Sequence, residues 1–223
     1  MSVLVALTAQ NTTAVTAIHE LPSEFVVAQL EAVFSDIGVD GAKTGMLFSR
    51  RLIETVADFL ADHRVPLVVD PVMVASSGAT LLEDDAVDAL VTRLFPLATV
   101  VTPNLGEAEA LVGSATKREL AERIHELGAP AVIVTGGHGA PVDHLFDGTE
   151  HLEIAVERHD VAATHGAGCT HSATLAALLA RGQTLDEAAR GAAEAASRAV
   201  AQGLPELGAG QGPVDVLDVK GRA

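Results

Sequence analysis

Residues 66–73 show the pattern that decides the fold, and they read Pro66-Leu67-Val68-Val69-Asp70-Pro71-Val72-Met73. The apolar, β-branched run Pro66–Asp70 predicts a short buried strand, and the proline after it predicts a turn. Similar short runs recur along the chain and alternate with longer segments of helical periodicity. This alternation is typical of a mostly parallel sheet with helices on its faces. We therefore predict one three-layer α/β/α sandwich.

Five short runs are the candidate strands of that sheet. They are Val3–Thr8, Val39–Thr44, Pro66–Asp70, Thr99–Thr102 and Ala131–Thr135. Farther along the chain the pattern changes around Asp147, where two runs predict a β-hairpin: His144–Phe146 and Leu152–Val156.

Helix boundaries are visible in the same way. Ser23 and Ser49 are expected N-caps of two early helices. Two capping boxes open later helices, each with threonine three residues before glutamate: Thr116-Lys117-Arg118-Glu119 and Thr184-Leu185-Asp186-Glu187. The last helix is alanine-rich and is expected to run from Glu187 to about Ala201.

The charge of the chain limits its partners. Thirty acidic residues face 14 basic ones, which gives a formal net charge of −16. Repulsion argues against nucleic acid and anionic membranes as partners. Such an acidic, lysine-poor surface fits a protein adapted to concentrated salt and fits an ordinary acidic enzyme equally well. A single cysteine excludes internal disulfides and favours a cytoplasmic location. No apolar run has transmembrane length.

Chemistry is expected where the predicted strands end, because ligands of open α/β sheets bind at the carboxyl ends of the strands. Five successive ends carry polar or glycine-rich groups: Gln10-Asn11-Thr12, Gly45-Met46, Asp70-Pro71-Val72-Met73, Thr102-Pro103-Asn104-Leu105-Gly106-Glu107 and Thr135-Gly136-Gly137-His138. Each alone could be a turn. Together they outline the rim of a binding site.

The segment His165-Gly166-Ala167-Gly168-Cys169-Thr170 precedes an apolar helix expected over Ala173–Leu179. Its backbone N–H groups and the positive end of the helix dipole suit a transferring phosphoryl group, so we expect an anion hole in the segment Gly166-Ala167-Gly168-Cys169. A thiol at a helix start is expected to have a lowered pKa, which makes Cys169 a candidate base. The alternatives are an ordinary glycine turn and a buried structural cysteine.

Carboxylate and amide oxygens offer a place for a divalent cation. Asn104 and Glu107 lie one helical turn apart, and with Asp70 they could hold Mg²⁺ that bridges nucleotide phosphates. A capping pair, with Asn104 as N-cap, explains the same spacing, and both roles can coexist. No Walker A run and no complete dinucleotide fingerprint is present.

Taken in order, these motifs resemble the hydroxymethylpyrimidine/phosphomethylpyrimidine kinases of thiamine biosynthesis, in the ribokinase-like superfamily. The quoted pieces are Ala9-Gln10-Asn11-Thr12, Lys43-Thr44-Gly45-Met46-Leu47, Val69-Asp70-Pro71-Val72-Met73, Thr102-Pro103-Asn104-Leu105-x-Glu107, Thr135-Gly136-Gly137-His138, Thr164-His165-Gly166-Ala167-Gly168-Cys169-Thr170 and Gly210-Gln211-Gly212-Pro213-Val214. The resemblance runs from Ser2 to about Val214. It implies ATP-dependent phosphorylation of 4-amino-5-hydroxymethyl-2-methylpyrimidine and of its monophosphate, with Mg²⁺.

The resemblance also implies roles for individual residues. Gln10 holds the aminopyrimidine, with Met46 and Val72 beside it. The anion hole falls on Gly166, Ala167 and Gly168, and Cys169 takes the base role. Asn104 and Glu107 are the pair associated with Mg²⁺. Asp70 is expected as a further metal ligand, and ATP is expected to lie against three residues: Thr135, Gly137 and Asn104. A homodimer is a family expectation.

One departure is at the N-terminus. Relatives have an additional strand, a glycine-rich loop and a helix before the point where this chain begins, so we expect residues 1–223 to form a single kinase domain that lacks them. A late start codon and a shortened protein are both open.

Two other functions stay open as well: a pyridoxal-type vitamin kinase, and a pyrimidine-binding protein without catalysis. A covalent cysteine enzyme is a more distant alternative.

Overall fold

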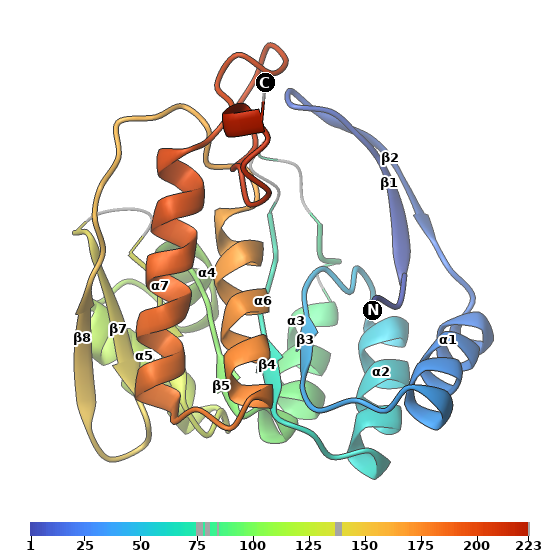
Figure 1. The fold of residues 1–223 in the computed structure, drawn as a ribbon. Helices are drawn as coiled ribbons and strands as arrows, with labels where there is room; N and C mark the ends of the chain where they lie inside the picture. The colour runs from blue at the N-terminus through green and yellow to red at the C-terminus, as the bar shows by residue number, and fades with distance from the viewer. Residues whose placement is uncertain (75–77, 79–80, 84, 137–139, 223) are drawn as a thin grey trace.

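The computed structural model describes residues 1–74, 78, 81–83, 85–136 and 140–222, and it has the predicted layered architecture (Figure 1). A six-stranded sheet runs in the order β3-β4-β5-β6-β7-β8. Its strands are β3 (Ala42–Thr44), β4 (Leu67–Val69), β5 (Val100–Val101), β6 (Val132–Val134), β7 (Val142–Phe146) and β8 (His151–Ala155). The first four are parallel, and β7 and β8 form the predicted antiparallel hairpin at one edge.

Helices cover the two faces of this sheet. They are α1 (Ser23–Asp36), α2 (Arg50–Asp62), α3 (Ala86–Ala89), α4 (Leu105–Val112), α5 (Lys117–Glu126), α6 (Ala167–Ala180) and α7 (Leu185–Ala201). A π-helical turn (Leu90–Leu94) and two 3₁₀ turns (Phe95–Leu97 and Lys220–Arg222) complete the set. Helices α6 and α7 lie together on the near face in Figure 1.

Side chains along each strand point alternately to the two faces of the sheet, and this produces two separate hydrophobic cores. Leu67 and Val69 of β4 pack with α1, α2, α4 and α5, whereas Val68 between them packs with α6 and α7. Because successive side chains of a strand point to opposite faces, a fully apolar strand such as β4 must be covered on both sides. All three of its residues are buried. This confirms the α/β/α sandwich.

Most helix starts are where the sequence predicts them. Both capping boxes form, since Thr116 and Thr184 accept the amides of Glu119 and Glu187. Ser49 caps α2 by accepting the amide of Leu52 at 3.3 Å. Ser23 is not the cap of α1: the N-cap is Pro22, which offers no side-chain bond, and the Ser23 hydroxyl accepts instead from Thr55 at 3.0 Å.

The expectation that the first strand joins the parallel sheet is wrong. The strand β1 (Ala6–Gln10) pairs antiparallel with β2 (Val15–Glu20) in a separate two-stranded hairpin, which arches away from the sheet in Figure 1. The physical reason is the turn between them. The Asn11 side chain accepts the amides of Thr13 and Ala14, both at 2.9 Å, which folds the chain back at once.

Candidate active site

Four of the five predicted strand ends lie at the carboxyl edge of the six-stranded sheet, where helix α6 begins, and the first lies on the β1–β2 hairpin. Asp70 follows β4 and lies beside Lys43 of β3, with 3.3 Å between Lys43 Nζ and Asp70 Oδ2. Ser172 of α6 donates its hydroxyl to the same Asp70 oxygen at 2.8 Å. The Ser172 hydroxyl is also 2.9 Å from Gly168 O, so one side chain joins the carboxylate to the first turn of the helix.

Glu107 is the second carboxyl group of the site. It is buried, and its Oε2 accepts the Asn104 amide at 2.9 Å while Asn104 Oδ1 accepts the Glu107 amide at 2.9 Å. The capping pair that the sequence left as an alternative is therefore present. The pKa of Glu107 is raised to about 7. Burial is the largest cause and the nearby Asp70 adds to it, while amide hydrogen bonds and Lys43 oppose the shift.

The first turn of α6 offers two unpaired donors. Gly166 precedes it with φ of 91°, a left-handed conformation that glycine adopts without strain. The Ala167 amide donates to Thr164 O at 3.1 Å and the Thr170 amide to Gly166 O at 2.8 Å. In the described part of the chain, the amides of Gly168 and Cys169 have no such partner. Of the residues predicted for the anion hole, Ala167 therefore already has its amide satisfied.

The prediction of an acidic thiol at Cys169 is wrong. Burial among the surrounding groups raises the pKa of the Cys169 thiol above its ordinary value, and Asp70 and Glu107 raise it further. Lys43, which hydrogen bonds to the thiol, pulls the pKa down without reversing the shift. The surface of Cys169 is nonetheless exposed. Lys43, Asp70 and Glu107 therefore act on the pKa of a thiol whose residue still reaches solvent.

The other predicted site residues have fewer contacts that link them to this site. Thr135 lies at the end of β6, where it bridges to Asn104 and donates its amide to Pro103 O at 2.9 Å. Met46 and Val72 follow β3 and β4 and are half-buried. Gln10 is exposed on the β1–β2 hairpin, and the hydroxyl of Thr8 is 3.4 Å from its side-chain oxygen. Gly137 lies outside the described residues.

Two positions were missed by the sequence analysis. Lys43 stands inside a quoted motif, and it is one of only three lysines in the chain, which was a usable signal. Ser172 gave none, because its partner Asp70 is 102 residues away along the chain.

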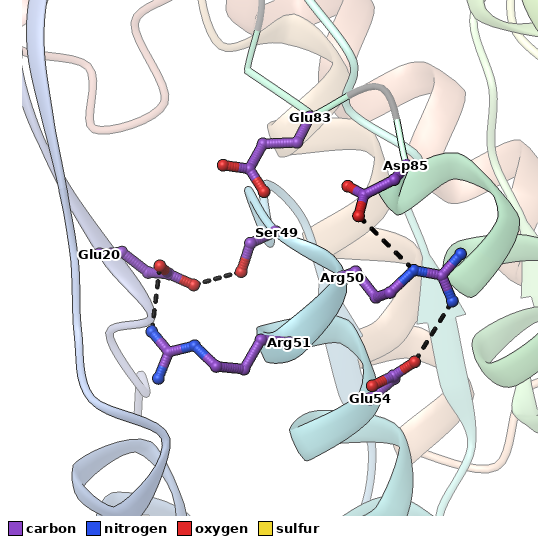
Figure 2. A pocket seen from close by; sticks show the side chains of 7 residues that line it. All are labelled: Glu20, Ser49, Arg50, Arg51, Glu54, Glu83 and Asp85. Atoms are coloured by element: carbon purple, nitrogen blue, oxygen red, sulfur yellow. Dashed lines mark hydrogen bonds and ion pairs between the residues drawn. The ribbon is translucent and has the colours of Figure 1, made fainter.

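A polar cavity of about 310 Å³ lies away from this chemistry, at the base of the hairpin (Figure 2). Figure 2 shows Glu20 of β2 facing Ser49 and Arg51 of α2. Glu20 accepts a hydrogen bond from the Ser49 hydroxyl and forms an ion pair with Arg51 at 3.0 Å. No residue of the Lys43–Asp70–Cys169 cluster lines this cavity. These contacts attach the hairpin to α2.

Comparison with known proteins identifies the family. The sequence model of the phosphomethylpyrimidine kinases matches residues 1–215. The chain belongs to the phosphomethylpyrimidine kinase family. It is 45% identical over 222 residues to a hydroxymethylpyrimidine/phosphomethylpyrimidine kinase of Streptomyces coelicolor, with 96% of this chain and 82% of the relative covered. It is 48% identical to the thiamine biosynthesis bifunctional protein ThiED of Geobacter sulfurreducens, covering 96% of this chain and 45% of that protein.

Solved structures agree with this assignment to a kinase family. An ADP complex of Bacillus subtilis pyridoxal kinase superposes with a TM-score of 0.87 at 35% identity, covering 99% of this chain and 87% of that one. A phosphomethylpyrimidine kinase from Clostridium difficile gives a TM-score of 0.76 at 35% identity, with 87% and 83% covered. The ribokinase-like fold predicted for this family member is confirmed. Within the described residues, no helix is long and apolar enough to cross a bilayer.

Proposed function

We propose that this chain transfers the γ-phosphoryl group of ATP to the hydroxymethyl group of 4-amino-5-hydroxymethyl-2-methylpyrimidine, and then phosphorylates the resulting monophosphate. The observation that carries the proposal is the pair of unpaired amides, Gly168 and Cys169, next to two carboxyl groups and a lysine. Such donors stabilise the charge that spreads over a transferring phosphoryl group.

Each part of the site has a place in this reaction. The Gly168 and Cys169 amides hold the transferring group, and the Cys169 side chain receives the proton of the attacking alcohol when it is a thiolate. Lys43 orients Asp70 through their ion pair. On the other side, Thr135 and Asn104 border the nucleotide, and Gln10, Met46 and Val72 border the pyrimidine.

Asp70 and Glu107 fit the needs of Mg²⁺. This ion binds through one or two carboxylates and completes its shell with phosphate oxygens and water. The two carboxyl groups are close enough for Asp70 to raise the pKa of Glu107, and this proximity supports the proposal that a positive charge binds between them. When bound, Mg²⁺ would neutralise charge on the phosphates. We also propose a cytoplasmic location, and the homodimer stays a prediction.

A pyridoxal-type kinase is the second candidate, because the TM-score to the Bacillus pyridoxal kinase exceeds that to the Clostridium phosphomethylpyrimidine kinase. ADP release, measured with the pyrimidine, its monophosphate and pyridoxal as acceptors, separates the two. We expect kcat/KM for the pyrimidine to exceed that for pyridoxal by about tenfold or more. The reverse order would assign the chain to the second function. Pyrimidine binding without ADP release would leave only the non-catalytic alternative.

A further inference from the structure

The first turn of α6 is held from two sides by two consecutive buried residues. Ser172 faces the carboxyl end of β4, where its hydroxyl donates to Asp70. His171 faces the opposite way, toward β7, and its Nε2 lies 3.4 Å from Asp143 Oδ2. The side chains of His171 and Asp143 are each only 5% exposed. Neither contact was visible in the sequence.

Asp143 continues this connection to the end of β6. Its Oδ1 accepts the backbone amide of Gly136, the residue after Thr135. The Gly136 backbone lies so close to β7 that a Cβ there would stand 2.8 Å from the amide of Val142. One carboxylate therefore contacts both the helix that carries the unpaired amides and the strand end that borders the proposed nucleotide position.

A buried histidine at position 171 would lower stability if its role were purely structural. Neither ring nitrogen makes a hydrogen bond within the described part of the chain, although both are buried. A buried polar group without a hydrogen bond destabilises the folded state. The next buried positions of α6, Leu175 and Ala176, are apolar, so leucine at 171 would pack without that cost. The histidine gains an interaction only from Asp143.

We propose that His171 and Asp143 are positioning residues for the polyphosphate chain of the nucleotide. They fix the spacing between the Gly168 and Cys169 amides on α6 and the Gly136 end of β6, so that the phosphates and the rest of the nucleotide are held in one register. Ser172 and Asp70 do the same on the metal and acceptor side. This inference rests on the proposed kinase function and adds the residues that determine nucleotide affinity.

Calorimetric titration with ADP tests the proposal. His171→Leu keeps the bulk and removes the contact with Asp143, and we expect the Kd for ADP to rise about tenfold. Asp143→Asn keeps an acceptor for the Gly136 amide but removes the charge, so a similar effect is expected. Asp143→Leu removes both contacts and is expected to weaken ADP binding the most. His171→Gln, which restores a donor, is expected to recover part of the affinity.

His151→Leu is the matched control. The Nε2 atom of His151 lies 3.0 Å from Glu122 Oε1. The substitution therefore removes a similar histidine–carboxylate contact, but one between β8 and α5. We expect it to leave the Kd for ADP within twofold of the wild type. Pyrimidine affinity is expected to stay unchanged in all these variants, a split that a general loss of stability would not produce.

Three outcomes would overturn the inference. One is an unchanged Kd for ADP in both His171→Leu and Asp143→Leu. Another is an equal loss of ADP and pyrimidine affinity. The third is a wild-type chain that binds no ADP. A wild-type chain that binds ADP but phosphorylates no pyrimidine would refute the proposed function, and the comparison of ADP affinities would still decide this inference.

Discussion

The carboxyl edge of the six-stranded sheet and the β1–β2 hairpin are built in different ways. At the sheet edge, Asp70, Glu107 and Ser172 are buried. Ser172 of α6 holds Asp70 after β4, and Glu107 is held by the amide of Asn104 in the capping box of α4. Most of the hairpin is exposed, and an isolated two-stranded ribbon is only marginally stable in water. It is attached at its base through Glu20 and at its tip through Thr12, whose hydroxyl accepts the Gly210 amide at 3.2 Å.

Because of this difference, we expect the sheet edge to determine the rate of phosphoryl transfer and the hairpin to determine the affinity for the acceptor. Groups that must match a transition state to a fraction of an ångström lie on the rigid sheet edge, where packing fixes them. The predicted pyrimidine contact, Gln10, lies on the exposed hairpin, where small movements cost little free energy. Changes at the sheet edge should therefore lower kcat, whereas changes on the hairpin should raise KM for the acceptor.

The largest expected effect is at Gly168. Gly168→Asp places a negative charge where the phosphoryl group must bind, and we expect kcat to fall by about 10³-fold or more while pyrimidine binding is retained. A Cβ at this position meets nothing within 4 Å, so the fold should tolerate the change. Gly168→Ala is the neutral control and should keep most activity. Turnover by Gly168→Asp near the wild-type rate would remove the anion hole from the mechanism.

Cys169→Ser is expected to lower kcat by about 10²-fold, the typical contribution of a general base. Because the thiol has a raised pKa, the active thiolate becomes more abundant as the pH increases, so the wild-type kcat should keep rising into the alkaline range. The serine variant should lack this rise. Thr170→Ser, next in the same turn, is the control. A flat wild-type pH profile together with an active serine variant would exclude Cys169 as the base.

Gln10→Ala is expected to raise KM for the pyrimidine about tenfold, the cost of one or two lost hydrogen bonds, with little change in kcat. Its melting temperature should match that of the wild type, since the Gln10 side chain is exposed. Thr16→Ala, on the neighbouring strand of the same hairpin, is the control for general loosening. A selective fall in kcat for Gln10→Ala would break the separation between the two regions.

The smallest expected effects are on stability, and they have opposite signs in the two regions. Glu107 has a folded-state pKa of about 7 against an ordinary 4.5, so its contribution to stability is present below pH 4.5 and is lost as the pH rises through 7. Glu107→Gln should therefore be more stable than the wild type at pH 8 by about 1–3 kcal/mol, and equally stable at pH 4. Denaturant unfolding in EDTA measures this difference.

Glu20→Gln is the hairpin counterpart. Burial alone raises the pKa of Glu20, but the hydrogen bonds from Ser49 and Arg51 outweigh it, and the net pKa is lowered. Its stabilising effect is therefore present above the ordinary pKa and is lost on acidification. Glu20→Gln should be less stable than the wild type at pH 8, by about 0–1 kcal/mol for a partly exposed pair. The same sign of change for both variants would contradict the electrostatic contrast between the regions.

Local features of the sequence determined much of this protein. The apolar runs around Val68 and Ile133, the capping boxes at Thr116 and Thr184, and the glycine at 166 each act through residues a few positions away. They therefore predicted the sandwich, most helix starts and the edge of the sheet where the polar strand ends lie.

The tertiary structure decided the rest. The chain folds back at Asn11 and pairs β1 with β2. The strand propensity of Val3–Thr8 could not predict this partner. The pKa of Cys169 rises because folding buries the thiol and brings Asp70 and Glu107, remote in sequence, near it. Likewise, His171 becomes a candidate positioning residue only because β7 brings Asp143 beside it. Electrostatic and hydrogen-bond energies depend on distances in space, and only the folded chain sets those distances.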